Sequence, residues 1–167
     1  MAEKNTVFST AMKYDGVFSF KDFYKFCYEW LTEETELDIV ESLYSEKITG
    51  DSKEILITWK GSKKLTDYFK FEMTVDFVIR KLKEVEISKG DIKIRSNKGD
   101  VKIKVKGTLV RDYEGKFERS GFQKFLRGIY EKWVITSRIE QFENSIIGSC
   151  DEFLSQAKAY LDLEGRK

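Results

Sequence analysis

The chain has 167 residues, enough for one domain with a sizeable hydrophobic core that needs neither a disulfide nor a metal to fold. Its 30 Lys and Arg residues nearly balance 29 Asp and Glu residues, and a formal charge of +1 makes nucleic acid a disfavoured partner. Histidine is absent, which excludes Ser-His-Asp and Cys-His catalysis and the usual zinc sites. We therefore predict no catalytic residue, no metal and no cofactor.

The first residues do not resemble a signal peptide, and no apolar run reaches the roughly 18 residues that a membrane span requires. We expect one cytoplasmic domain over residues 1–167, with residues 1–5 disordered. The two cysteines, Cys27 and Cys150, fall on the apolar sides of predicted helices. This placement favours buried, unreactive thiols over a catalytic one.

Three elements are expected in the first 50 residues. A strand is predicted within residues 4–14, before a turn at Asp15 and Gly16. Ser19 and Asp22 then resemble a capping box, and apolar residues at helical spacing predict a helix over residues 20–34. Residues 36–50 fit either a second helix or a strand, and we favour a strand that enters the sheet.

A two-residue period follows. It predicts strands over residues 55–59 and 69–79 whose odd-numbered side chains face the core, and residues 83–87 alternate in the same way. Residues 92–105 predict a hairpin with Lys98 and Gly99 as its two-residue turn. In that hairpin Arg95 faces Lys102 and Lys93 faces Lys104.

The last part of the chain is predicted to be helical. An amphipathic helix over residues 122–133 is expected to break at three β-branched residues, 134–136, and a long helix over residues 137–163 follows, with Gly165 as its stop. The predicted fold class is α+β. A curved antiparallel sheet of about six strands wraps around the long C-terminal helix, with one N-terminal helix after the first strand.

Several stretches carry a resemblance to a known superfamily: TDYFKFEMTVDFVI, DIKIRSNKGDVKIKVKG, DYEGKFE, FLRGIYEKW and RIEQFENSIIGSCDEFLSQAKAYLDLEG. Their order resembles the START-like helix-grip superfamily, which includes polyketide cyclases and lipid-transfer domains, and is similar to small uncharacterised archaeal proteins. The resemblance implies that a curved sheet wraps the C-terminal helix and leaves an apolar cavity between them. The superfamily has no signature residues to carry over.

Inward-facing apolar side chains are the candidates for such a cavity: Trp59, Phe69, Phe71, Met73, Phe77, Trp133, Phe142 and Ile146. The leading hypothesis is a non-enzymatic protein that binds an apolar small molecule or lipid among them. The alternative is that these side chains fill the space and form an ordinary core.

Basic residues of the predicted hairpin form the second candidate site, a contact for a polyanion: Lys93, Arg95, Lys102, Lys104 and Lys106. The corresponding hypothesis is an interaction module that docks on a protein or nucleic-acid partner through this face or through a strand edge, without an internal ligand. A solvated outer face is the simpler interpretation, and the absence of aromatic residues disfavours recognition of single strands.

Carboxylates are the third set of candidates, as acids or bases of an enzyme acting within the cavity: Asp76, Asp112, Glu114, Glu140 and Asp151. With 29 acidic residues in the chain, such groups are expected to be mostly solvated. An enzyme is therefore the least favoured of the three interpretations.

Overall fold

The computed structural model describes residues 3–115, 121–134 and 136–165, without the side chains of Lys89, Trp133 and Val134. The elements in chain order are β1 (Glu3–Phe18), α1 (Phe20–Glu34), β2 (Asp38–Thr49), β3 (Ser52–Lys64), β4 (Phe69–Lys89), β5 (Ile92–Arg111), α2 (Gly121–Ile129), the π-helical turn η1 (Tyr130–Val134) and α3 (Thr136–Gly165). The described strands form one antiparallel sheet in the order β1-β5-β4-β3-β2. The predicted α+β class is confirmed.

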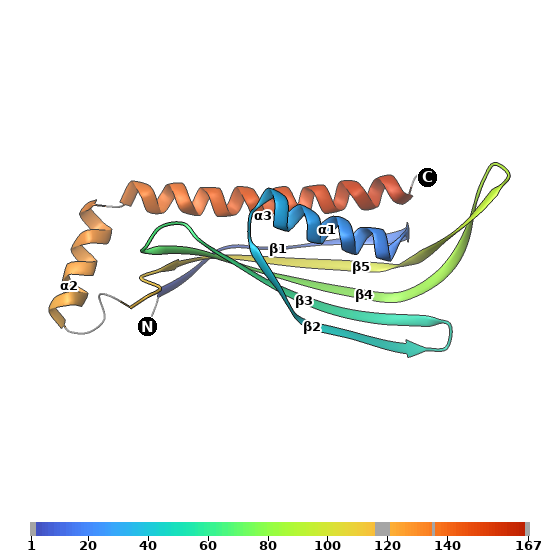
Figure 1. Cartoon of the computed structure of the whole chain (residues 1–167), viewed down its shortest axis with the longest axis horizontal. Helices are drawn as coiled ribbons and strands as arrows, with labels where there is room; N and C mark the ends of the chain where they lie inside the picture. Colours follow the sequence, from blue (N-terminus) through green and yellow to red (C-terminus); the bar gives the residue numbers. More distant parts are fainter. Residues whose placement is uncertain (1–2, 116–120, 135, 166–167) are drawn as a thin grey trace.

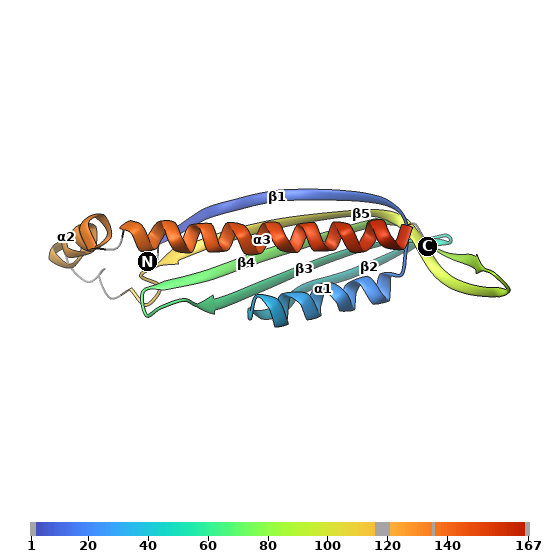
Figure 2. The same cartoon turned by 90° about the horizontal axis from the view of Figure 1, so that it is seen from above.

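One face of the sheet is covered by α1 and α3, which lie side by side along it (Figures 1 and 2). The alternation predicted for residues 69–79 is confirmed, since every odd-numbered side chain there is buried and every even-numbered one is only partly covered. The helices complete this core with side chains at helical spacing: Phe23, Cys27 and Leu31 of α1, and Ile146, Cys150, Phe153, Leu154, Ala157 and Leu161 of α3.

The long helix lies close to the sheet at Gly107 of β5. A Cβ atom at this position would lie 2.7 Å from Sγ of Cys150 and 2.8 Å from Cγ2 of Ile146. Because no side chain fits there, glycine allows α3 to rest directly on the backbone of β5. The helix begins at Thr136, one residue before the predicted start, so Thr136, which was expected to lie in the break, is helical. Val134 is the last residue of η1. Ile135 lies outside the described residues.

Two expectations about the N-terminal half have clear outcomes. Residues 36–50 were ambiguous between helix and strand, and β2 confirms the strand. The disorder expected for residues 1–5 is wrong for Glu3, Lys4 and Asn5, which begin β1 and pair with Arg111, Val110 and Leu109. Residues 1–2 lie outside the described part of the chain.

The predicted hairpin with a turn at Lys98 and Gly99 is wrong. β5 runs without interruption from Ile92 to Arg111, and the turn lies at Gly90 instead, so the described strands number five rather than six. Gly99 is buried where β4 bulges after Arg80, and a Cβ there would lie 3.1 Å from the Arg80 carbonyl oxygen. This glycine therefore allows strands to approach each other and does not form a turn.

Beyond this bulge, β4 and β5 continue as a two-stranded arm, residues 85–96, in which Ile87 lies opposite Ile94. Figure 1 shows the arm projecting past the C-terminal end of α3. At the opposite end of the molecule, α2 lies across the long axis, near the N-terminal end of α3 (Figures 1 and 2). The covered sheet between these two ends holds the core.

Candidate functional site

The predicted cavity residues are packed on one another in two groups. Trp59 and Phe77 are buried with their ring centroids 4.8 Å apart, and the ring of Tyr24 lies 5.2 Å from Trp59. Phe69 and Phe142 form the second group, with centroids 5.1 Å apart. Phe71, Met73 and Ile146 are also buried, and the side chain of Trp133 lies outside the described part of the structure. These contacts are those of a filled core.

Four depressions in the described surface, with volumes of about 380 to 660 Å³, have no cavity candidate in their lining. The largest of these four is polar and lies beside Tyr14, Lys98 and Asp162. Binding of an apolar ligand between sheet and helix therefore stays a prediction from sequence.

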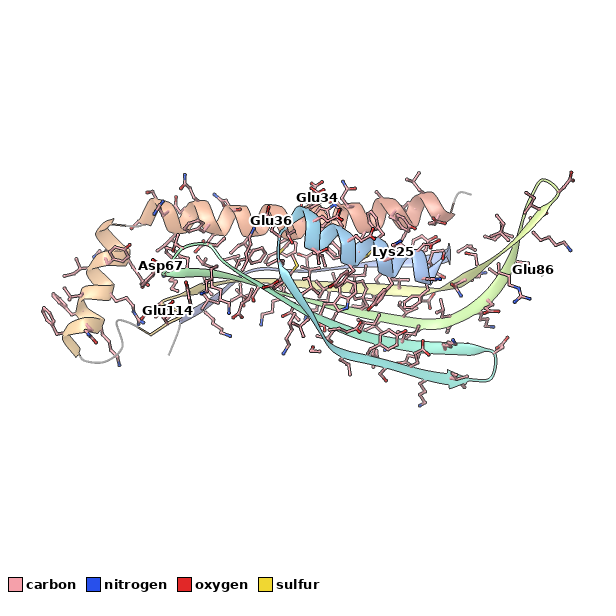
Figure 3. The ribbon with its side chains drawn as sticks, viewed as in Figure 1. Lys25, Glu34, Glu36, Asp67, Glu86 and Glu114 are labelled. Atoms are coloured by element: carbon pink, nitrogen blue, oxygen red, sulfur yellow. The ribbon has the colours of Figure 1, made fainter. Side chains whose placement is uncertain are left out.

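The five basic residues predicted to share one face lie on two. Lys102, Lys104 and Lys106 are exposed between the buried side chains of β5, on the side of the sheet that faces away from α1 and α3, called here the outer face. Lys93 and Arg95 belong to the arm, where Arg95 lies opposite Glu86 and not opposite Lys102. Figure 3 shows Glu86 on this arm. The predicted facing pairs are wrong because strand β5 does not fold back at Gly99.

A fourth lysine, from another strand, joins the outer face. Lys13 of β1 lies directly opposite Lys102, and together with Lys104 and Lys106 it forms what we call the lysine row. Within the described ranges, none of these four lysines forms an ion pair. Like charges on directly opposite strand positions are mildly destabilising, so the pair of Lys13 and Lys102 does not stabilise the sheet, whereas Lys104 lies opposite Asp76 of β4.

Acidic residues gather on the helical side of the molecule. α3 carries six acidic residues against Arg138 and Lys158, and α1 carries four against Lys21 and Lys25. Figure 3 shows Glu34 at the end of α1, away from the outer face of the sheet. The whole-chain charge of +1 therefore conceals an acidic helical side and a more basic sheet.

An ionic cluster joins α2 and η1 to the end of the sheet. Arg127 lies 3.5 Å from the carboxylate of Asp112 and 3.7 Å from that of Glu3. Arg111 lies 3.6 Å from Glu131, whose carboxylate also accepts a hydrogen bond from the Tyr68 hydroxyl. Burial, followed by this hydrogen bond to Glu131, raises the pKa of Tyr68.

Among the five candidate carboxylates, Asp112 is the one that is not solvated as expected. It is buried, and it adopts a left-handed conformation with φ 51° at the end of β5. Asp76 is half-buried and accepts a 2.7 Å hydrogen bond from the Thr58 hydroxyl, whereas Glu114, Glu140 and Asp151 are exposed. The ion pair with Arg127 gives Asp112 an anchoring role.

The two thiols are buried, as the sequence predicted. Both cysteines are buried and free, and burial raises the pKa of Cys150 to about 12 and that of Cys27 above its usual value. Over the described residues, no three His, Cys, Asp or Glu side chains are grouped as metal ligands would be. Among the described helices, none is long and apolar enough to cross a bilayer.

Comparison with family models, with curated proteins and with solved structures found no match to this chain. Its function is therefore inferred from its own residues.

Proposed function

We propose that this protein is an interaction module that binds the phosphate backbone of duplex nucleic acid through the outer face of its sheet. The observation that carries the proposal is the lysine row: four exposed lysines on two neighbouring strands, without ion pairs in the described structure, on the face away from the helices. A surface that places Lys13 directly opposite Lys102, at some cost in stability, and exposes two further lysines beside them suits a polyanionic partner.

The composition of the row suits phosphates rather than bases. Lysine binds phosphate as a point charge, and each phosphate that it neutralises releases condensed counterions. The strand neighbours of Lys102, Lys104 and Lys106 are Lys13, Ala11 and Ser9 on β1 and Val78, Asp76 and Thr74 on β4, none of which is aromatic. Because no aromatic side chain is available to stack on bases, the surface favours a duplex over a single strand, and its phosphate contacts do not distinguish one base sequence from another.

The acidic helical side orients the complex. Its carboxylates repel a polyanion, while the lysine row attracts it, so encounter is steered toward one face. The sequence disfavoured nucleic acid because of the low net charge, but the net charge does not report how charge is distributed over the two faces.

We also propose a START-like helix-grip fold for the chain. The support is that β1 pairs with β5, the last of the described strands, and that α3 lies along the sheet (Figure 2). Since the interior is packed, this fold serves here as a rigid support for a surface and not as a ligand container.

The test compares two triple variants with the same change of charge. The first, Lys102→Glu with Lys104→Glu and Lys106→Glu, removes the row, and the second replaces Lys21, Lys25 and Lys158 of the helical side by Glu. Anisotropy of a labelled duplex is measured over a range of salt concentrations. We expect the first variant to bind weakly. The slope of the logarithm of the binding constant against the logarithm of the salt concentration should be smaller in magnitude by about two to three, since each phosphate contact contributes about 0.9.

The control variant should retain most of the binding, because its substitutions lie away from the row. Absence of binding by the unmodified protein, or an equal loss in both variants, would contradict the proposal. Displacement of the duplex by polyglutamate at equal charge concentration would assign the row to acidic proteins instead.

A further inference from the structure

Helix α2 is attached to the rest of the molecule by its polar side. Arg127, whose side chain is 15% exposed, reaches both Asp112 and Glu3, and the ring of Tyr130 lies 5.5 Å from that of Tyr68. These contacts turn the Arg127 side of the helix toward the end of the sheet. The opposite side of α2 therefore faces away from the molecule.

That outward side is apolar. Phe122, Phe125, Leu126 and Ile129 recur at the three-and-four spacing that forms one stripe on a helix, and they are 68%, 62%, 39% and 39% exposed. An amphipathic helix normally turns such a stripe toward the core. In α2 the arrangement is reversed, which implies that something outside the described chain covers the stripe.

We infer that the apolar stripe of α2 binds the surface of an anionic lipid bilayer. The charge of the helix supports this occupant: from Gly121 to Tyr130 the sequence has no acidic residue, and Lys124 is exposed on the polar side of the helix, whereas Arg127 is already paired with Asp112 and Glu3. Aromatic and aliphatic side chains on one face with basic residues on the other are the pattern of helices that lie in the membrane interface.

The size of the stripe argues against a second copy of the chain. If each of these side chains has a total accessible area of about 200 Å², the exposed area of the four together is on the order of 400 Å². A stable protein interface needs about 800 Å² from each partner. A bilayer has no such threshold, because shallow insertion of a few side chains suffices when basic residues add electrostatic attraction.

The place of α2 in the molecule suits a flat surface. The helix forms one end of an elongated molecule and lies across its long axis, with the arm at the other end (Figures 1 and 2). A bilayer perpendicular to the long axis can therefore meet α2 along its length, and the outer face of the sheet remains free at the side.

Flotation of the full chain with vesicles tests the inference. Vesicles of phosphatidylcholine alone are compared with vesicles that contain about one third phosphatidylglycerol, at about 0.15 M salt. We expect the protein to float with the anionic vesicles only. The variant Phe122→Ser with Phe125→Ser should bind them about tenfold more weakly or worse, because two insertable rings are lost.

A matched control removes two apolar side chains of equal exposure elsewhere: Val40→Ser with Ile48→Ser on β2, where the side chains are 64% and 67% exposed. This variant should float like the unmodified protein. The inference would be overturned if the Phe variant still floated with the anionic vesicles, or if the β2 variant also failed to float. So would a protein that does not float and instead forms dimers that the Phe substitutions abolish.

The lysine-row variant separates this inference from the proposed function. Because Lys102, Lys104 and Lys106 lie on the outer face and not at the α2 end, their replacement by Glu should leave flotation unchanged while duplex binding falls. Loss of flotation in that variant would place the lipid contact on the sheet and overturn the assignment to α2.

Discussion

The guanidinium of Arg127 lies 3.5 Å from the carboxylate of Asp112, whose side chain is only 1% exposed. This pair connects α2 to the residue that follows β5, and replacement of Arg127 takes a counterion away from a buried carboxylate. We expect Arg127→Ala to lower the free energy of unfolding by about 3 kcal/mol in urea denaturation.

The exposed pair of Lys25 and Glu29 provides the control for this prediction. Its side chains are 74% and 54% exposed and lie 3.9 Å apart, so Lys25→Ala should change stability by about 0.5 kcal/mol or less. An equally small effect of Arg127→Ala would mean that Asp112 does not depend on this partner.

A second prediction concerns the contact between α3 and the sheet. Gly107→Ala would place a Cβ 2.7 Å from Sγ of Cys150, and the resulting shift of α3 should cost about 1 to 3 kcal/mol of stability. Adding Cys150→Ala removes the sulfur and should recover part of that loss. Gly148→Ala is the control, because nothing lies within 4 Å of a Cβ there. Thermal unfolding measures all three variants, and equal melting temperatures would contradict the predicted contact.

The structural role of Gly99 could not be predicted from its neighbours in the sequence. Lys98 and Gly99 have the composition of a hairpin turn, yet Gly99 lies inside a strand where a bulge of β4 approaches it. The bulge follows Arg80, 19 positions earlier in the chain, so no local pattern distinguishes the two roles. By contrast, the alternation in residues 69–79 and the Ser19 cap, which accepts a hydrogen bond from the Asp22 backbone, follow from neighbouring residues and were predictable.

The candidate sites were predictable to a similar extent. The periodicity of residues 122–129 predicted an apolar stripe on a helix, but its direction depends on contacts of Arg127 with residues far away in sequence. Likewise, Lys102, Lys104 and Lys106 were expected to share a face, whereas the addition of Lys13 follows from the pairing of β1 with β5. Long-range pairing is the information that single-sequence patterns lack.

Ionisation of Tyr24 gives a prediction about alkaline pH. Burial, followed by a 2.7 Å hydrogen bond that its hydroxyl donates to Glu41, raises the pKa of Tyr24 from 10.0 to about 12. A pKa that is higher in the folded state adds stability that is complete below pH 10 and lost as the pH rises toward 12. Urea denaturation should therefore show a decline in this window that is shallower in Tyr24→Phe. An equal decline in both proteins would exclude ionisation of Tyr24 as the cause of the loss of stability.

The packed interior predicts the outcome of a ligand titration. Because Trp59 and Phe77 are in ring contact and buried, a fluorescent fatty acid should show no saturable binding to the unmodified protein. Phe77→Ala opens space for the volume of a ring and should allow a small apolar molecule such as benzene to bind. Saturable fatty-acid binding by the unmodified protein would instead support the ligand hypothesis that the sequence suggested.

The last prediction separates stability from function at the lysine row. Lys13 lies directly opposite Lys102, and Lys13→Glu converts a like-charge pair into an opposite-charge pair. We expect the free energy of unfolding to rise by about 0.5 kcal/mol, since cross-strand pairs of opposite charge are favourable. Affinity for the duplex should fall at the same time, because one phosphate contact is lost and a negative charge is added. Urea denaturation and duplex anisotropy on the same variant measure the two effects. If the free energy of unfolding rises while duplex affinity stays the same, the row is not the binding surface. If the free energy of unfolding rises and duplex affinity falls, Lys13 serves binding of the duplex at a cost in the stability of the fold.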